Sequence, residues 1–404
     1  MIFKESGKGV ARMLTKTISH FLAGVALSAA VSGCSGLPNL NEKPDLRPFE
    51  KPLAINTRPK RMAIGNGFVV AIKEDGTVWS WGSGYYGQLG TGKEDWRHFQ
   101  PKQLPQLSEM VEVATGIYHV LALKSDGTVW AWGKGWEWVH KPPFSVKTGD
   151  KKVYIPTKIV GVANVKRIAA TSNGYVFLTK DGDLIGWGNN EGDPFNSPEK
   201  IVATPTVYAH VPDAVSLFSG VDVTGVIRAD GSIVTWGRLN QVDEKTLSTI
   251  KIADINTVGF LTQILAQDGF VYAATSTSTE VLGQGKPIKG GGFMRVKNLG
   301  RIVQIADVMG PMALDETGRV WQWGASVLSE PDPGGNGVTR EYTPIVTFKL
   351  TGVSEIYPWA AFTRDGSVYF WGQGQGGVRT RDWQDHRPSQ EEWTQPEKIN
   401  WTWK

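Results

Sequence analysis

The chain has 404 residues, a formal net charge of +4 and one cysteine, Cys34. Four Lys or Arg residues and one acid fall within residues 1–33, and removing that +3 leaves about +1 for the remainder. This balance disfavours nucleic-acid binding, which needs a basic face, and a lone cysteine excludes disulfide bonds within the chain.

Residues 1–33 have the pattern of an export signal. A largely apolar stretch, ISHFLAGVALSAAVSGC, follows a basic start and is too short and interrupted to span a membrane comfortably. Val31-Ser32-Gly33-Cys34 resembles the lipobox of bacterial lipoproteins, which implies that Cys34 becomes the first residue and carries a lipid. Ser35 in place of Asp implies sorting to the outer membrane. The basic start comprises Lys4, Lys8, Arg12 and Lys16.

Residues 34–59 predict a lipidated Cys followed by a Pro-rich tether. Prolines disfavour both helices and strand ladders, so the segment is expected to be semi-extended. At about 3.1 Å per residue it would hold a globular body several tens of ångströms from a membrane. The prolines are Pro38, Pro44, Pro48, Pro52 and Pro59.

Residues 60–404 contain seven copies of one segment. In the first copy, EDGTVWSWG, Asp-Gly is followed six residues later by Trp-Gly, and alternating apolar runs lie on both sides of Asp-Gly. Such a pattern predicts a tight β-hairpin, and a further β-rich run upstream gives about four strands per copy. Seven repeats of about 49 residues predict an all-β fold, a seven-bladed β-propeller. The copies end at Gly82, Gly133, Gly188, Gly237, Thr275, Gly324 and Gly372.

The first copy, DGTVWSWGSGYYGQLGTG, resembles the repeat of the regulator of chromosome condensation family, which implies the same fold. Only this copy keeps Gly87-Gln88-Leu89-Gly90, and only the second keeps a histidine, His119, before Asp-Gly. The family's eukaryotic role, nucleotide exchange on a nuclear GTPase with chromatin binding, is disfavoured because export would separate the chain from both partners. One bacterial family member inhibits β-lactamases through a loop face.

The C-terminal segment predicts how the ring closes. Pro396 to Lys404 resembles Pro101 to Glu109, which precedes the strand pattern of the second repeat. We therefore predict that the N- and C-terminal segments pair in one blade, with Trp401 and Trp403 packed at the seam.

No motif points to catalysis, a metal or a cofactor. Gly82 to Gly87 matches the G-x-G-x-x-G pattern of dinucleotide sites, but no helical pattern follows it, as such a site requires. The histidines lack metal-ligand spacing and G-x-S-x-G is absent, so we expect His119 to be a buried repeat residue. We expect no catalytic residue, no metal and no cofactor.

Aromatic residues in the loops supply the candidate site. Nine of the 17 tryptophans fall in the repeats and predict packing between blades; the other eight lie elsewhere. Aromatic and Arg side chains on loops are typical of interface anchors, although long loops can also bury their own aromatics. The candidate partner-binding residues are Tyr85, Tyr86, Trp96, Trp136, Trp138, Arg381, Trp383 and Trp393.

These patterns favour a non-enzymatic, lipid-anchored protein-binding scaffold of the cell envelope. We expect a monomeric outer-membrane lipoprotein, facing the periplasm or the cell surface, that binds envelope proteins and touches the membrane through its lipid alone. Three alternatives stay open: an inhibitor of a secreted or periplasmic enzyme, a module that stacks cell-wall glycans on Trp and Tyr, and an enzyme acting on such polymers.

Overall fold

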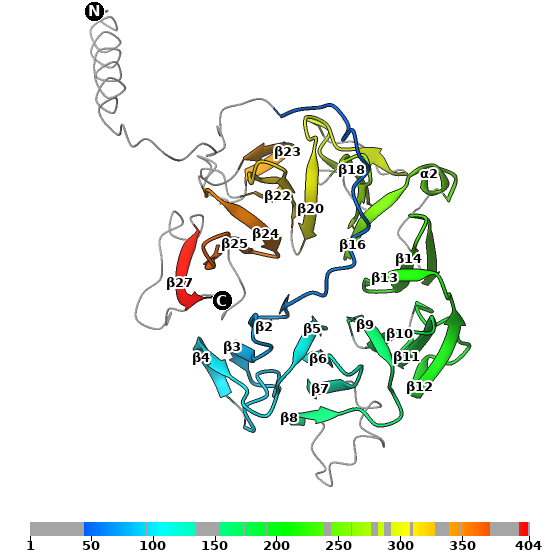
Figure 1. Cartoon of the computed structure of the whole chain (residues 1–404), viewed down its shortest axis with the longest axis vertical. Helices are drawn as coiled ribbons and strands as arrows, with labels where there is room; N and C mark the ends of the chain where they lie inside the picture. The colour runs from blue at the N-terminus through cyan, green and yellow to red at the C-terminus, as the bar shows by residue number, and fades with distance from the viewer. Residues whose placement is uncertain are drawn as a thin grey trace, which may run out of the picture. The chain divides into compact units, whose positions relative to one another are not determined.

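Seven antiparallel sheets are arranged in a ring, which confirms the predicted seven-bladed propeller (Figure 1). Each blade uses consecutive strands, and its first strand lies nearest the ring's centre. The structure, a computed structural model, describes residues 44–93, 95–134, 153–172, 174–190, 192–237, 244–259, 261–275, 282–286, 292–307, 310–327, 339–346, 350–371 and 396–402.

Blades 1 to 3 each have the four strands that the repeat predicts. In blade 1, Asp75-Gly76 lies between β2 and β3, whose register pairs Val70 with Ser80. The strands of these blades are β1 (Met62–Ile64), β2 (Phe68–Ile72), β3 (Val78–Gly84), β4 (Asp95–Gln103), β5 (Met110–Thr115), β6 (His119–Lys124), β7 (Val129–Gly133), β8 (Val153–Lys158), β9 (Val165–Ala170), β10 (Gly174–Thr179), β11 (Asp183–Asn189) and β12 (Ile201–His210).

Blades 4 to 7 continue the ring with one departure. Blade 4 has three described strands, and the short helix α2 (Glu244–Thr249) follows where a fourth strand was expected. Leu247 and Ile250 are three residues apart, a helical spacing, and both pack into the core between blades 4 and 5. The strands are β13 (Ala214–Ser219), β14 (Val223–Arg228), β15 (Ile233–Gly237), β16 (Ile252–Val258), β17 (Leu261–Ala266), β18 (Val271–Thr275), β19 (Met294–Arg295), β20 (Ile302–Asp307), β21 (Pro311–Asp315), β22 (Val320–Val327), β23 (Thr339–Val346), β24 (Val353–Tyr357), β25 (Ala360–Thr363), β26 (Ser367–Phe370) and β27 (Glu397–Thr402).

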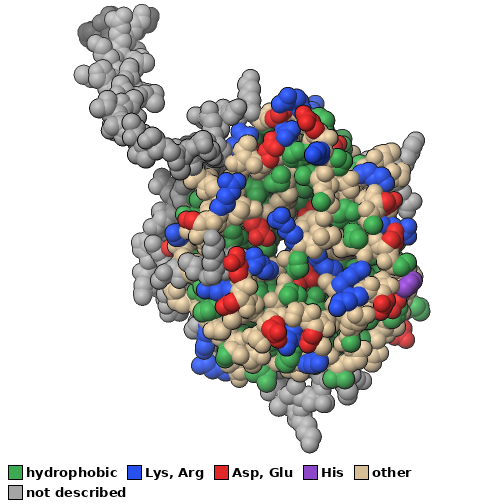
Figure 2. All heavy atoms as spheres, in the orientation of Figure 1, with side chains coloured by type: hydrophobic (Ala, Val, Ile, Leu, Met, Phe, Trp, Pro, Cys, Tyr) green, Lys and Arg blue, Asp and Glu red, His purple; other side chains and the backbone are tan. Residues whose placement is uncertain are grey.

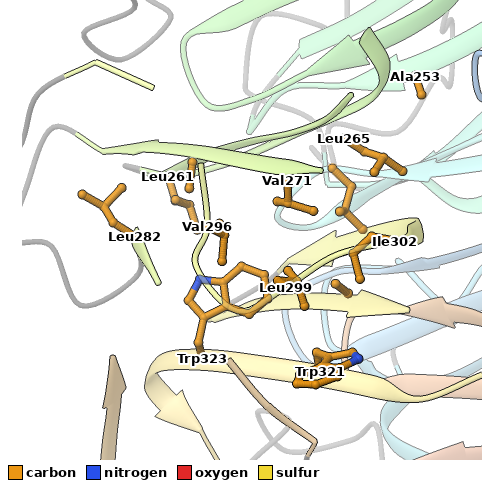
Figure 3. Close-up of a cluster of buried hydrophobic side chains, with 13 residues drawn as sticks. Ala253, Leu261, Leu265, Val271, Leu282, Val296, Leu299, Ile302, Trp321 and Trp323 are labelled. Carbon is orange, nitrogen blue, oxygen red and sulfur yellow. The ribbon is translucent and has the colours of Figure 1, made fainter. Parts of the chain in front are cut away.

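The repeat tryptophans pack between blades, as the sequence predicts. Trp323 of β22, in blade 6, lies beside Val296 and Leu299, which directly follow the last strand of blade 5. Its indole therefore fills the space between the two sheets (Figure 3). A buried indole removes a large apolar area from water, which makes it an efficient filler of a tapering gap. The fully buried indoles are Trp81, Trp132, Trp187, Trp323 and Trp371.

The predicted closure by a shared blade is wrong. β1 pairs with β2 in blade 1, whereas β27 pairs with β26 in blade 7, so the two terminal segments belong to neighbouring sheets. The resemblance to Pro101 misled the prediction because Pro101 lies within β4, the fourth strand of its own blade. Trp401 nevertheless packs at the seam, as expected; Trp403 lies outside the described residues.

Residues 44–60, which we call the strap, do not form a free tether. They adopt no helix or ladder, as their prolines predict, yet they cross the ring from blade 5 towards blade 1 (Figure 1). The backbone N–H groups of Phe49, Leu53 and Asn56 donate hydrogen bonds to carbonyl oxygens of blade 5. These bonds replace the hydrogen bonds to water that the strap backbone loses when it docks on the propeller. The proline content of the segment predicts its extended conformation but not this docking.

Among the residues that the structure describes, no helix combines the length and apolar character needed to span a membrane.

Candidate functional site

The propeller has two chemically different rims. Because successive strands are antiparallel, turns between first and second strands lie at one end of each blade and Asp-Gly turns at the other. We call the first end the loop rim and the second the hairpin rim. Residues that connect each third strand to its fourth also leave from the loop rim, since the backbone N–H of Ser83 bonds to the carbonyl of Gly67 there.

Carboxylates on the hairpin rim are engaged by their own turns. Asp75 accepts bonds from the backbone N–H of Thr77 at 2.9 Å and from its hydroxyl at 2.7 Å. These bonds lower the pKa of Asp75, and an equivalent pair from Ser232 lowers the pKa of Asp230 to about 2. The repeated aspartates therefore serve turn geometry, as the sequence predicts.

The segment that matches the dinucleotide pattern comprises the end of β3 and the turn that follows it. β3 ends at Gly84 and β4 begins at Asp95, so a strand stands where a nucleotide site needs a helix. The Gln88 side chain accepts a bond from the backbone N–H of Tyr86 at 2.7 Å, and the Trp132 indole donates to the Gln88 carbonyl at 2.9 Å. The turn thus seals blade 1 against blade 2 and fixes the backbone that carries Tyr86.

Three tyrosines form a cluster on the loop rim at the junction of blades 1 and 2. The ring centroids of Tyr85 and Tyr86 lie 4.7 Å apart, and those of Tyr86 and Tyr118 lie 4.4 Å apart. Lys134 places its ammonium 4.7 Å from the centroid of the Tyr86 ring, and the Asn66 amide donates to the Tyr118 hydroxyl at 3.2 Å. All three tyrosines are half-buried. A rigid aromatic surface with polar tips is typical of protein-binding anchors.

The tyrosine cluster contains two of the eight predicted residues, Tyr85 and Tyr86. Sequence reasoning missed Tyr118, although its place directly before His119, in the first turn of blade 2, was a usable signal. Trp96 lies on β4, but its side chain is outside the described set. Cys34 and the other five candidates also lie outside the described residues and stay predictions: Trp136, Trp138, Arg381, Trp383 and Trp393.

Two of the eight tryptophans outside the repeat motifs belong to the propeller body. Trp401 is only 7% exposed and lies between blades 7 and 1. Trp359 is half-buried against the core between blades 6 and 7. Each packs singly against a core, whereas the tyrosine cluster brings three half-buried rings together on the loop rim, so the cluster is the stronger candidate among the described side chains.

The centre of the ring encloses a cavity of about 1080 Å³. All seven blades and the strap line it, and Ile117 and Val221 stand at its loop-rim mouth with 38% and 45% of their surface exposed. On the face in Figure 2, cationic and anionic side chains are interspersed around the centre. The described side chains on that face therefore carry charges of both signs rather than one.

In blades 2 to 7 the first strand has a register shift against the second strand. The residue directly after this shift occupies the same position in every one of these blades. Glu112 pairs with Arg167 of the next blade at 2.9 Å and accepts the backbone N–H of Ile168 at 3.1 Å. Gln304 likewise bonds to both backbone groups of Ile356 at 2.7 and 2.9 Å. Glu112, Arg167 and Gln304 thus tie neighbouring blades. The residues at this position are Glu112, Arg167, Ser216, Asp254, Gln304 and Glu355.

Buried ionisable groups here have structural partners. Burial raises the pKa of Glu112 and of Asp254, while the Arg167 charge and hydrogen bonds partly oppose that effect. Burial lowers the pKa of His119 to about 4, so its neutral ring packs on Tyr175 at 4.7 Å, as a buried repeat residue should. Within the described ranges, no group of three His, Cys, Asp or Glu side chains converges as a metal site would require.

Comparison with known proteins identifies the repeats. Models of the regulator of chromosome condensation (RCC1) repeat match residues 75–123, 60–88 and 165–192. Protein pim1 of Schizosaccharomyces pombe is 27% identical over 199 residues, which are 44% of this chain and 36% of pim1. RUG3, a mitochondrial RCC1 domain-containing protein of Arabidopsis thaliana, is 25% identical over 342 residues, 78% of this chain and 66% of RUG3. Guanine nucleotide exchange factor SRM1 of Saccharomyces cerevisiae is 27% identical over 214 residues, 48% of this chain and 42% of SRM1.

Solved structures agree on the fold. Prp20p from Saccharomyces cerevisiae superimposes with a TM-score of 0.57 at 19% identity, over 70% of this chain and 75% of that chain. Yeast RCC1 (Prp20) bound to Kap60 gives 0.59 at 16% identity, over 87% of this chain and 95% of that chain. The chain therefore contains RCC1 repeats and folds as their seven-bladed propeller.

Proposed function

We propose that this chain is a non-enzymatic propeller that binds a protein partner through the tyrosine cluster on its loop rim. The observation that carries the proposal is the contact of Tyr85, Tyr86 and Tyr118 beside Lys134. The hydrogen bond from the Tyr86 backbone to Gln88 holds this aromatic surface in place before a partner arrives, so little conformational entropy is lost on binding.

Proteins with the same repeats support protein binding as the general use of the fold. SRM1 is named as a guanine nucleotide exchange factor. The two solved structures concern Prp20p binding to Gsp1p and histones, and its complex with Kap60. Partner choice depends on the loops rather than on the fold, so the partner of this chain must be inferred from its own loop rim.

We also propose that the chain is an exported lipoprotein of the cell envelope, anchored through Cys34. The basic start, the apolar stretch and Val31-Ser32-Gly33-Cys34 support this proposal. Mass spectrometry of the mature N-terminus tests it: a diacylglyceryl-modified Cys34 is expected, and Cys34→Ser should release the protein from membranes. An unmodified N-terminus at another residue would contradict the anchor but leave the binding surface untouched.

Photo-crosslinking tests the binding surface. A benzoylphenylalanine at Tyr85 should give one discrete protein adduct in cells that produce the chain, whereas the same probe at Ser125, exposed on the hairpin rim, should not. Excess wild-type protein should suppress the adduct, and excess Tyr86→Ala/Tyr118→Ala protein should not. Retention on purified peptidoglycan with no adduct at Tyr85 would overturn the proposal in favour of glycan binding.

A further inference from the structure

The strap is bound to the propeller over its length. The backbone N–H of Phe49 donates to the Asp268 carbonyl at 2.9 Å, and that of Leu53 donates to the Gln267 carbonyl at 2.7 Å. Asp268 belongs to the Asp-Gly turn of blade 5, so this end of the strap lies on the hairpin rim. The Phe49 ring also lies under the Arg301 guanidinium, 4.6 Å from its centroid.

The middle of the strap bonds to the walls of the central cavity. Asn56 donates its backbone N–H to Ala253 at 2.7 Å and its side-chain amide to the buried Asp254 carboxylate at 2.8 Å. Arg167 donates to the carbonyls of Thr57 and Arg58 at 2.6 and 3.2 Å. The strap therefore joins blade 5 to blade 3 before it enters β1 of blade 1.

Close packing leaves the first strap residues little freedom. At Gly300, a Cβ atom would lie 2.4 Å from the Asp45 carbonyl oxygen, so the strap fits against a position that admits no side chain. Leu53 and Ile55 pack against the cores on either side of blade 5. The chain is thus already fixed to the hairpin rim of blades 5 and 6 near Pro44.

We propose that the strap is an orienting clamp, which turns the loop rim away from the surface to which the chain is anchored. The inference rests on the proposed lipid anchor at Cys34. Only nine residues lie between Cys34 and Pro44, ten Cα–Cα steps in all, so the body lies within about 35 Å of that surface rather than at the end of a long tether. The anchored side is then the hairpin rim, and the tyrosine cluster faces outward to its partner.

Hydrogen exchange tests the clamp in solution, without any lipid. In residues 34–404, the N–H groups of Leu53 and Asn56 should exchange at least about tenfold more slowly than an unstructured chain. Phe49→Ala combined with Asn56→Ala should remove this protection. Leu46→Ala is the matched control, because Leu46 is in the strap but 48% exposed. Unprotected amides in the wild type would overturn the clamp.

Energy transfer tests the orientation. The sole cysteine, Cys34, allows coupling to a maleimide lipid in vesicles whose headgroups carry an acceptor, which bypasses cellular lipidation. A donor is attached through azidophenylalanine at Val221 or at Ala229, both exposed and at opposite ends of β14, about 20 Å apart.

Transfer should be more efficient from Ala229, on the hairpin rim, than from Val221, on the loop rim. The Phe49→Ala/Asn56→Ala variant should reduce that difference, and Leu46→Ala should preserve it. Equal transfer from the two sites in the wild type, or a reversed order, would overturn the orientation. Failure of Cys34 lipidation in cells would instead remove the proposed anchor, so the two failures are distinguishable.

Discussion

The indole rings of Trp81 and Trp401 lie 5.6 Å apart across the seam between the first and last blades, with their planes at 54°. Among the described strands none is shared across this seam, because β1 and β27 each pair within their own sheet. Side-chain packing, rather than strand pairing, therefore holds the first and last blades together. Trp401 is the largest side chain that the last strand contributes.

We expect Trp401→Ala to lower the free energy of unfolding by about 3–5 kcal/mol, because it leaves a large cavity between two sheets. Val160→Ala, at a 66% exposed position, should change it by less than about 0.5 kcal/mol. Denaturant unfolding followed by far-UV circular dichroism measures both. A loss below about 1 kcal/mol for Trp401→Ala would show that the seam does not depend on this contact.

His119 predicts a pH dependence of stability. Its folded pKa is about 4 against an ordinary value of 6.5, because burial disfavours the charged ring. The folded state therefore binds this proton less readily than the unfolded state. The stability it contributes is complete above pH 6.5 and is lost as the pH falls towards 4, by about 3 kcal/mol in total.

Phe68 occupies the position of His119 in blade 1, so His119→Phe is a matched variant. We expect the variant to lose less stability than the wild type between pH 7 and pH 4, measured by urea unfolding at a series of pH values. Parallel curves for the two proteins would contradict a neutral, buried His119.

Local turn chemistry explains which parts of this fold were predictable. Asp126 and Thr128 form their turn within three residues, so the hairpin is visible in the sequence wherever that pattern recurs. The strap was not predictable in the same way. Arg167 bonds to the backbone carbonyls of Thr57 and Arg58, about 110 residues away. Every residue has a backbone carbonyl, so no residue type in the strap indicates this contact. Tyr118 belongs to blade 2 and contacts Tyr86 of blade 1, so its place in the candidate site depends on how the two blades pack.

The Glu112–Arg167 pair should be costly to break from one side. Both side chains are buried, with 1% and 8% of their surface exposed, so Arg167→Met leaves a buried carboxylate without its countercharge. We expect a loss of about 3–5 kcal/mol near neutral pH, and a smaller loss for Glu112→Gln combined with Arg167→Met. Thermal and denaturant unfolding of the single and double variants form the double-mutant cycle.

The pH dependence of Arg167→Met has the opposite sign to that of His119. Burial raises the folded pKa of Glu112 above its ordinary value of 4.5, and removing Arg167 removes an opposing charge. The folded state then binds the proton more readily than the unfolded state, so the variant should regain stability as the pH falls from 8 towards 4.5. If the loss in free energy of unfolding caused by Arg167→Met did not change with pH over that range, the buried Glu112 charge could not be its cause.

Alanine substitutions at two turn glycines would distinguish the cost of backbone strain from the cost of a steric contact. Gly76 and Gly161 both have positive φ, at 78° and 82°, so alanine is strained at either position. A Cβ at Gly76 would lie 3.1 Å from the Glu109 backbone, whereas one at Gly161 meets nothing within 4 Å. We expect Gly161→Ala to cost about 1 kcal/mol from backbone strain alone. Gly76→Ala should cost measurably more in urea unfolding, because the Asp75 turn must also move away from blade 2; equal losses would show that the turn approaches Glu109 without constraint.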